Sequence, residues 1–165
     1  MTLTDDRTAP TTADLIDRAA IAELTCRMGV LADQRRWVEL ADLFTDRVDI
    51  DYTSLLGGQP ATVTRKDLVT GWAGTLTGLD ATQHMISNHQ TRVDGDSASC
   101  EAYFQATHML ANPHGSSRWA LGGQYRFSLL RVDGEWRISA VVMRAVWADG
   151  NQNVMALAAA AAAPS

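Results

Sequence analysis

The chain has 165 residues, enough for one globular domain that buries roughly 70% of its unfolded surface and can contain a pocket. Hydrophobic residues make up 46% and charged residues 20%, which is the composition of a folded domain and argues against a disordered chain. The net charge of -5 and the pI near 5.2 argue against nucleic acid or an anionic membrane as partner, so we expect a small-molecule substrate.

The N-terminal segment gives no signal for export or membrane insertion. No apolar run approaches the roughly 20 residues of a membrane span, and Met1–Pro10 contains no hydrophobic stretch like that of a signal peptide. We therefore expect a cytoplasmic protein in which residues 1–11 form a disordered tail. Cys26 and Cys100 show no metal-ligand spacing and are expected to be buried free thiols, so neither a metal site nor a disulfide is predicted.

The first predicted element is a helix from residue 12 to about residue 36, with Thr11 or Thr12 as its N-cap. Apolar residues at intervals of three and four predict a core-facing stripe: Ile21, Leu24, Met28 and Leu31. A second face of small residues lies roughly opposite and ends in a carboxylate: Ala22, Cys26, Gly29 and Asp33. A helix with two such faces lies between other elements, so Asp33 is predicted to point into the protein.

Three further elements are predicted before residue 80. A short helix covers 37–44, and alternation over residues 48–52 predicts a half-buried strand with Tyr52 on its apolar side. A third helix begins after Thr64, and Trp72 lies on its apolar face.

After residue 80 the hydrophobic period changes to two, which predicts four long strands over 82–93, 97–110, 118–132 and 135–147. The turn sequences between them, above all Asp133-Gly134, predict consecutive hairpins and therefore a curved antiparallel sheet. Helices followed by such a sheet give an α+β fold with the helices on one side. The alanine-rich residues 150–165 are predicted to be a frayed helix or a disordered tail without site chemistry.

Alternation along the strands selects the histidines that could share a pocket. His108 is the single ionisable group on the apolar face of its strand. On the preceding strand one face carries His84 and Asn88 and the other carries His89, and we place His84 inward. Because His84 and His89 would point to opposite faces, they should not bind one metal ion together. His89 and His114 are assigned to the surface or a loop.

Large side chains at inward positions predict a pocket wall: Trp72, Phe104, Trp119, Tyr125, Met143 and Trp147. Together with Asn88 they form the predicted substrate-binding set, which suits a cyclic, largely apolar ligand. Buried carboxylates and histidines are also common as purely structural groups, so pattern alone leaves Asp33 and His108 between structural and catalytic roles.

A series of short motifs lies along residues 12–149: Asp17-Arg18-Ala19-Ala20-Ile21-Ala22-Glu23-Leu24, Asp33, Trp37, Leu43-Phe44, Ile50-Asp51-Tyr52, Thr82-Gln83-His84 and Asp133-Gly134-Glu135-Trp136-Arg137. Together they resemble the SnoaL-like branch of the nuclear transport factor 2-like superfamily, and within it the scytalone dehydratase-like proteins. The resemblance implies a cone-shaped α+β barrel, with a curved antiparallel sheet packed on three N-terminal helices around a deep pocket. It also implies catalysis without a cofactor by an Asp-His pair.

The resemblance assigns roles to four residues. Asp33 and His84 match the catalytic pair, with His84 as general base and Asp33 as the residue that orients it. Tyr52 matches a tyrosine that helps to activate the substrate carbonyl through water. His108 matches a second histidine when the two sequences are shifted by two residues along the strand. A shift of two keeps the side chain on the inward face, and His108 would protonate the departing hydroxyl.

Three positions depart from the scytalone dehydratases. Ala32 stands in place of a tyrosine, and Gly123 and Tyr125 stand in place of a serine and an asparagine, so scytalone itself is not the expected substrate. The resulting hypothesis is a dehydratase-type lyase acting on a cyclic hydroxylated ketone. The same residues could serve an isomerase or a polyketide cyclase, and a non-catalytic ligand-binding or subunit-assembly module is a further alternative. A homo-oligomer, dimer or trimer, is expected.

Overall fold

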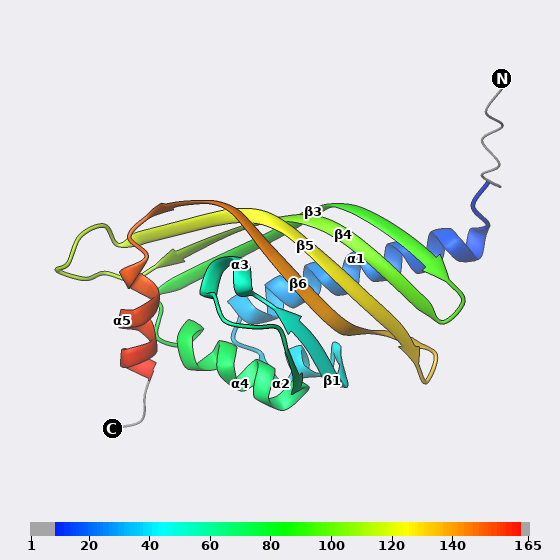
Figure 1. Cartoon of the computed structure of the whole chain (residues 1–165), viewed down its shortest axis with the longest axis horizontal. Coiled ribbons are helices and arrows are strands. Elements are labelled where there is room, and N and C mark those ends of the chain that lie inside the picture. The colour runs from blue at the N-terminus through cyan, green and yellow to red at the C-terminus, as the bar shows by residue number, and fades with distance from the viewer. Residues whose placement is uncertain (1–8, 163–165) are drawn as a thin grey trace, which may run out of the picture.

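The computed structural model describes residues 9–162 (Figure 1). Its elements follow in the order α1 (Thr12–Asp33), α2 (Trp37–Ala41), β1 (Phe44–Asp51), α3 (Thr53–Leu56), β2 (Ala61–Thr64), α4 (Arg65–Leu76), β3 (Ala81–Asp94), β4 (Ser97–Met109), β5 (Arg118–Val132), β6 (Glu135–Gly150) and α5 (Asn153–Ala162). The four long strands end within three residues of their predicted bounds. The predicted α+β class is therefore confirmed.

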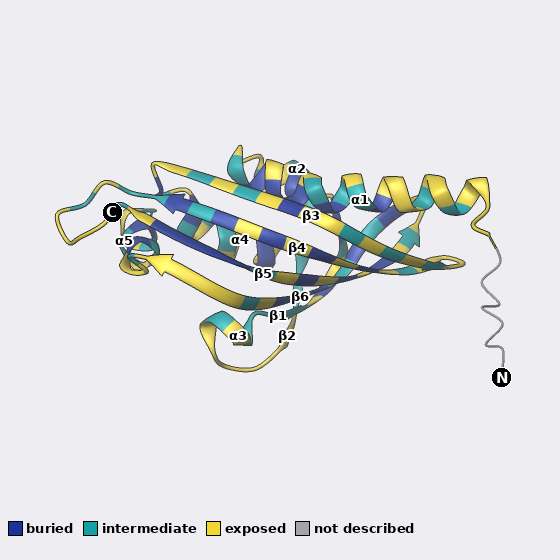
Figure 2. Ribbon diagram, turned by 90° about the horizontal axis from the view of Figure 1, so that it is seen from above, coloured by how far each residue is buried: buried dark blue, intermediate teal, exposed yellow. Residues whose placement is uncertain are grey.

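The six strands form one sheet in the order β2-β1-β6-β5-β4-β3. The hairpins from β3 to β6 are antiparallel as expected, whereas β1 pairs with β6 in parallel. The sheet curves without closing, so β2 and β3 remain as its edges (Figure 1). Figure 2 shows α1, α2 and α4 on one side of this sheet, which is the arrangement implied for three helices.

Helix α1 lies along β3, and its sequence explains both ends of the helix (Figure 1). Thr11 forms a capping box, since its hydroxyl accepts from the Asp14 N–H at 3.1 Å and the Asp14 carboxylate accepts from the Thr11 N–H at 2.8 Å. Three residues of the predicted stripe are buried, Ile21, Met28 and Leu31, each at most 4% exposed, and Leu24 is partly buried. No helix among residues 9–162 is both long and apolar enough to cross a bilayer.

The C-terminal end of α1 comes three residues earlier than predicted. The Arg36 N–H donates to Leu31 O at 2.9 Å and the Arg35 N–H donates to Ala32 O at 3.1 Å, which is the bond pattern of a Schellman motif. Arg35 takes the left-handed conformation that this motif requires, with φ of 57°. Its guanidinium donates to the carbonyl of Leu79, just before β3. Asp33 is therefore the last residue of the helix and is held near the start of β3.

The segment between α1 and α4 differs most from the prediction. Helix α2 ends at Ala41, and β1 begins at Phe44 and stops at Asp51. Tyr52 consequently lies just beyond the strand, at the start of α3. The elements α3 and β2 were not predicted, because four residues are too few to establish a hydrophobic period.

The alanine-rich segment forms a helix over Asn153–Ala162, which is one of the two predicted alternatives, but this helix packs against the domain and does not form a loose tail. Val154 and Ala158 are fully buried. Ala158 lies against Gly78, where an added Cβ would collide with its carbonyl group, so α5 packs directly beyond the end of α4 (Figure 1). Most of the predicted N-terminal tail, and residues 163–165, lie outside the described residues.

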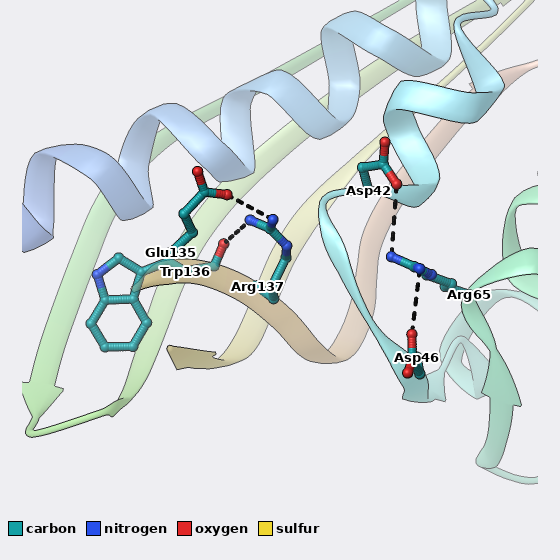
Figure 3. Close-up of polar contacts among 6 residues, drawn as sticks. All are labelled: Asp42, Asp46, Arg65, Glu135, Trp136 and Arg137. Atoms are coloured by element: carbon teal, nitrogen blue, oxygen red, sulfur yellow. Dashed lines mark hydrogen bonds and ion pairs between the residues drawn. The ribbon is translucent and has the colours of Figure 1, made fainter. Parts of the chain in front are cut away.

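Ion pairs near the surface join α4 to the start of β1, and another lies within β6 (Figure 3). Arg65, the first residue of α4, lies 3.7 Å from Asp42 and 3.4 Å from Asp46, on either side of the start of β1. On β6, Arg137 pairs with Glu135 at 2.7 Å. Pairs this accessible to water contribute at most about 1 kcal/mol each, so the buried core dominates stability.

Candidate active site

Two hydrogen bonds join Asp33 to His84. His84 Nδ1 lies 2.6 Å from Asp33 Oδ1, and the His84 backbone N–H donates to Asp33 Oδ2 at 2.8 Å. Both side chains are mostly buried, with 19% and 17% of their area exposed. Because the carboxylate can only accept, Nδ1 carries a proton, and in the neutral ring the lone pair therefore lies on Nε2. The predicted contact between helix and strand is thus present.

The small residues of α1 explain how the helix comes close enough for this contact. A Cβ added at Gly29 would lie 3.0 Å from the Cβ of His84, so a larger residue would push helix and strand apart. One turn earlier the Cys26 thiol donates to Ile86 O at 3.3 Å. Cys26 and Cys100 are both free thiols; Cys100 is buried, as predicted, whereas Cys26 is half-buried.

A cavity of about 610 Å³ lies between the helices and the sheet, and both His84 and His108 line it. Five of the predicted substrate-binding residues line it as well: Trp72, Phe104, Trp119, Tyr125 and Met143. No Lys or Arg is among the described residues that line the cavity, and Asp67 is the single carboxylate among them. A volume of this size accommodates a molecule of several fused rings.

Helices α3 and α5 complete the wall of the cavity. The contribution of these two helices was not predicted from the sequence. Leu55 and Leu56 come from α3, whereas Met155 and Ala156 come from α5. The spacing of Val154 and Ala158 by four residues was the available signal for a packed helix, but the long alanine run concealed it.

His108 is 4% exposed and occupies the inward face of β4. Its ring centroid lies 5.5 Å from that of His84 and 5.5 Å from that of Trp119. Its Nδ1 lies 2.9 Å from the hydroxyl oxygen of Thr82. The pKa of His108 is lowered to about 4, mainly by burial and also by the nearby imidazole of His84, while Asp33 opposes both effects. The ring is therefore neutral at pH 7, which does not fit the predicted role as the group that protonates the departing hydroxyl.

Two tyrosines, Tyr52 and Tyr125, line the cavity. Tyr52 stacks on Trp72 with centroids 6.4 Å apart, and Tyr125 packs on Phe104 at 4.5 Å. Burial raises the pKa of Tyr52 well above 10, with the neighbouring Tyr125 as a further cause, and burial raises the pKa of Tyr125 as well. Both hydroxyls consequently stay protonated and can donate hydrogen bonds.

Asn88 does not line the cavity, so its prediction as a substrate-binding residue is wrong. A bulge between Ser87 and Gln90 interrupts the pairing of β3 with β4, and Asn88 takes a left-handed φ of 58° at that point. After the bulge His89 turns toward α1, with Nε2 3.8 Å from the Cys26 sulfur. His89 is therefore half-buried on the same side of the sheet as His84, contrary to both predictions made for it.

Trp147 also lies outside the cavity, for the same kind of reason. Gly122 pairs with Trp147 but Gly123 pairs with Ala145, so β6 carries one extra residue there and the alternation reverses. The indole covers Gly122 on the outer face of the sheet and is 45% exposed.

Comparison with known proteins gives matches in sequence and in structure. The uncharacterized protein Rv2910c of Mycobacterium tuberculosis is 35% identical over 95 residues, which are 57% of this chain and 62% of that protein. The chain thus spans less than two thirds of the length of this curated relative.

Two solved structures share the fold over most of the chain. The protein Kfla4162 of Kribbella flavida is 31% identical with a TM-score of 0.80, over 87% of this chain and 97% of that one. A protein of Novosphingobium aromaticivorans, provisionally named a scytalone dehydratase, is 23% identical with a TM-score of 0.75, over 87% and 93% of the two chains. Residues 13–142 match the SnoaL-like domain, and the chain therefore belongs to the SnoaL-like domain family.

Proposed function

We propose that the protein is a cofactor-independent lyase that removes water from a cyclic, largely apolar hydroxylated ketone. The observation that carries this proposal is the double hydrogen bond of Asp33 to His84 at a cavity of about 610 Å³. Membership in the SnoaL-like domain family and the structural likeness to a protein provisionally named a dehydratase support it.

The proposed reaction begins at Nε2 of His84. The carboxylate of Asp33 holds the Nδ1 proton, so Nε2 offers a lone pair to the cavity. It removes a proton from the carbon next to the substrate carbonyl, and Asp33 stabilises the imidazolium that forms. The electron pair of the broken C–H bond passes into an enolate. A tyrosine hydroxyl can donate to the enolate oxygen, and Tyr52 is the residue we assign to this role.

Collapse of the enolate then breaks the bond to the β-hydroxyl, and the oxygen leaves with the electron pair. We propose that the imidazolium of His84 returns its proton to this oxygen, which gives water and the alkene and restores the enzyme. His108 is neutral and donates a hydrogen bond to the departing oxygen, a revision of the proton-donor role first assigned to it. The two rings are 5.5 Å apart, so both can reach one side of a substrate.

The lining of the cavity indicates the class of substrate. Its walls are mainly aromatic and aliphatic, and no Lys or Arg of the described residues lines it to neutralise a carboxylate or phosphate. We therefore propose a neutral polycyclic or polyketide-like ketone. An isomerase or cyclase would begin with the same proton removal, and the product distinguishes these reactions, since only elimination releases water.

A screen of hydroxylated polycyclic ketones tests the proposal, with products analysed by mass spectrometry. Wild type should convert at least one ketone to a product that lacks one water. Asp33→Asn should lower kcat by about 10² to 10⁴-fold while the circular dichroism spectrum stays unchanged. Tight binding of ketones without turnover by wild type would instead support the non-catalytic binding module.

A further inference from the structure

Thr82 lies directly across from His108 in the pairing of β3 with β4. Its hydroxyl oxygen is 2.9 Å from His108 Nδ1, within hydrogen-bond distance. Thr82 is not one of the residues that line the cavity, whereas His108 is. The threonine therefore contacts the histidine from behind, on the side away from any bound ligand.

The direction of this hydrogen bond decides which nitrogen of His108 carries the proton. A neutral imidazole has one N–H and one lone pair, on Nδ1 and Nε2 in either order. If Thr82 accepted, its own hydroxyl hydrogen would have no acceptor among the described side chains and backbone. If Thr82 donates, that hydrogen is paired, Nδ1 accepts it, and the proton of the ring lies on Nε2.

His84 has the opposite arrangement because its Nδ1 faces a group that can only accept. The carboxylate of Asp33 requires a proton on Nδ1, which leaves Nε2 of His84 as an acceptor. The two adjacent imidazoles thus differ in the group that contacts Nδ1, which is the Asp33 carboxylate for His84 and the Thr82 hydroxyl for His108. No protein group within residues 9–162 is bonded to Nε2 of either ring, so both nitrogens are available to a ligand.

We propose that Thr82 is a positioning residue that holds His108 in the Nε2–H tautomer, so that the cavity receives an acceptor nitrogen from His84 and a donor N–H from His108. What the donor does in catalysis rests on the function proposed above. The tautomer itself does not, and it can be measured in the unliganded protein.

Two-bond ¹⁵N–¹H correlation spectra at pH 7 test the tautomer, with His108 assigned from the signals lost in His108→Gln. We expect the Nε2–H pattern for His108 in wild type and in Thr82→Ser, which keeps the hydroxyl. In Thr82→Val, an isosteric change suited to a strand, the Nδ1–H form should become substantially populated. Thr91→Val is the matched control, since Thr91 lies inward on the same strand, bonds to Cys100 at 3.4 Å and is outside the cavity lining.

An Nδ1–H pattern for His108 in wild type would overturn the inference, as would identical His108 spectra for wild type and Thr82→Val. The first outcome needs no variant, so the inference stays testable even if Thr82→Val fails to fold. Wild type that shows the expected tautomer but converts no ketone would refute the proposed function and leave this inference standing.

Kinetics with an accepted ketone then test the consequence for catalysis. Thr82→Val should lower kcat about tenfold with little change in KM, because the donor acts on the departing oxygen and not on the resting substrate. Thr82→Ser should restore most of the rate. An unchanged kcat in Thr82→Val would overturn the catalytic part of the inference.

Discussion

Gly29 of α1 lies against His84 of β3 so closely that a Cβ at residue 29 would be 3.0 Å from the His84 Cβ. This separation is shorter than an ordinary van der Waals contact, and the backbone of β3 stands behind it. The distance between helix and strand at this point also sets the bond between Asp33 and His84, so the glycine controls the geometry of the candidate catalytic pair.

Gly29→Val should therefore lower kcat by at least about tenfold, because a displacement near 1 Å at a catalytic group is costly. Gly29→Ala should have a smaller effect in the same direction. Gly74→Ala is the control, since no atom lies within 4 Å of a Cβ added there, and it should leave kcat unchanged while stabilising α4 by about 0.5 to 1 kcal/mol. Equal kcat for wild type and Gly29→Val would show that the close approach has no catalytic role.

The stability of the protein should depend on pH through His108. Its pKa is about 4 in the folded state and 6.5 when exposed, so the unfolded chain binds more protons between these values. Above pH 6.5 His108 does not reduce the free energy of unfolding. As the pH falls toward 4, protonation of the unfolded chain lowers this free energy by up to about 3 kcal/mol. Urea unfolding of wild type and His108→Gln at pH 7 and pH 4.5 should show a steeper loss in wild type. His114→Gln, in an exposed loop, should behave as wild type. The same pH dependence in all three proteins would contradict a neutral buried ring.

Asp17 does not line the cavity, and we expect it to contribute to the stability of the fold. Its Oδ1 accepts from Arg131 at 2.8 Å and from the indole of Trp136 at 3.0 Å, and Arg131 lies 4.3 Å from the Trp136 ring centre. These bonds lower the pKa of Asp17, the bond from Arg131 most. Asp17→Ala leaves the largely buried indole N–H unpaired and should lower the free energy of unfolding by about 1 to 3 kcal/mol. Glu101→Gln, which removes an exposed pair with Arg126, should cost far less, and equal losses would refute the special role of Asp17.

The outer face of the sheet exposes large apolar side chains on β3, β4 and β6. Met85 is 51% exposed, Tyr103 54% and Trp147 45%. We propose that this face associates two or three copies of the chain. Tyr103→Glu combined with Trp147→Glu should lower the mass measured by light scattering to that of one chain. Val38→Glu, at an exposed apolar residue of α2, should not, and a monomeric wild type would refute the proposal.

Long periodic segments of the sequence were sufficient to predict most of the fold. The positions of β3 to β6 followed from alternation over at least 12 residues each, and the two faces of α1 followed from the helical spacing of residues 21–33. The same helical spacing brought Asp33 to an inward face, and the structure places it against His84. A hydrophobic period counted over many residues predicts an element correctly even where single residues depart from the pattern.

Single-residue irregularities account for the errors at the site. A bulge adds one residue to a strand, and every side chain beyond it changes face, as happened to His89 and Trp147. Nothing in the hydrophobic pattern marks the position of such a bulge. The role of α5 was missed because it depends on tertiary contact with Gly78, and Thr82 was missed because its partner is set by the register of β3 on β4.

The most direct test of His84 as the base is exchange of the acidic carbon-bound proton of an accepted ketone in deuterium oxide, followed by mass spectrometry or NMR. Wild type should exchange this proton, and His84→Gln should do so at least about 100-fold more slowly while it still binds the ketone. Exchange by His84→Gln at the wild-type rate would show that another group removes the proton.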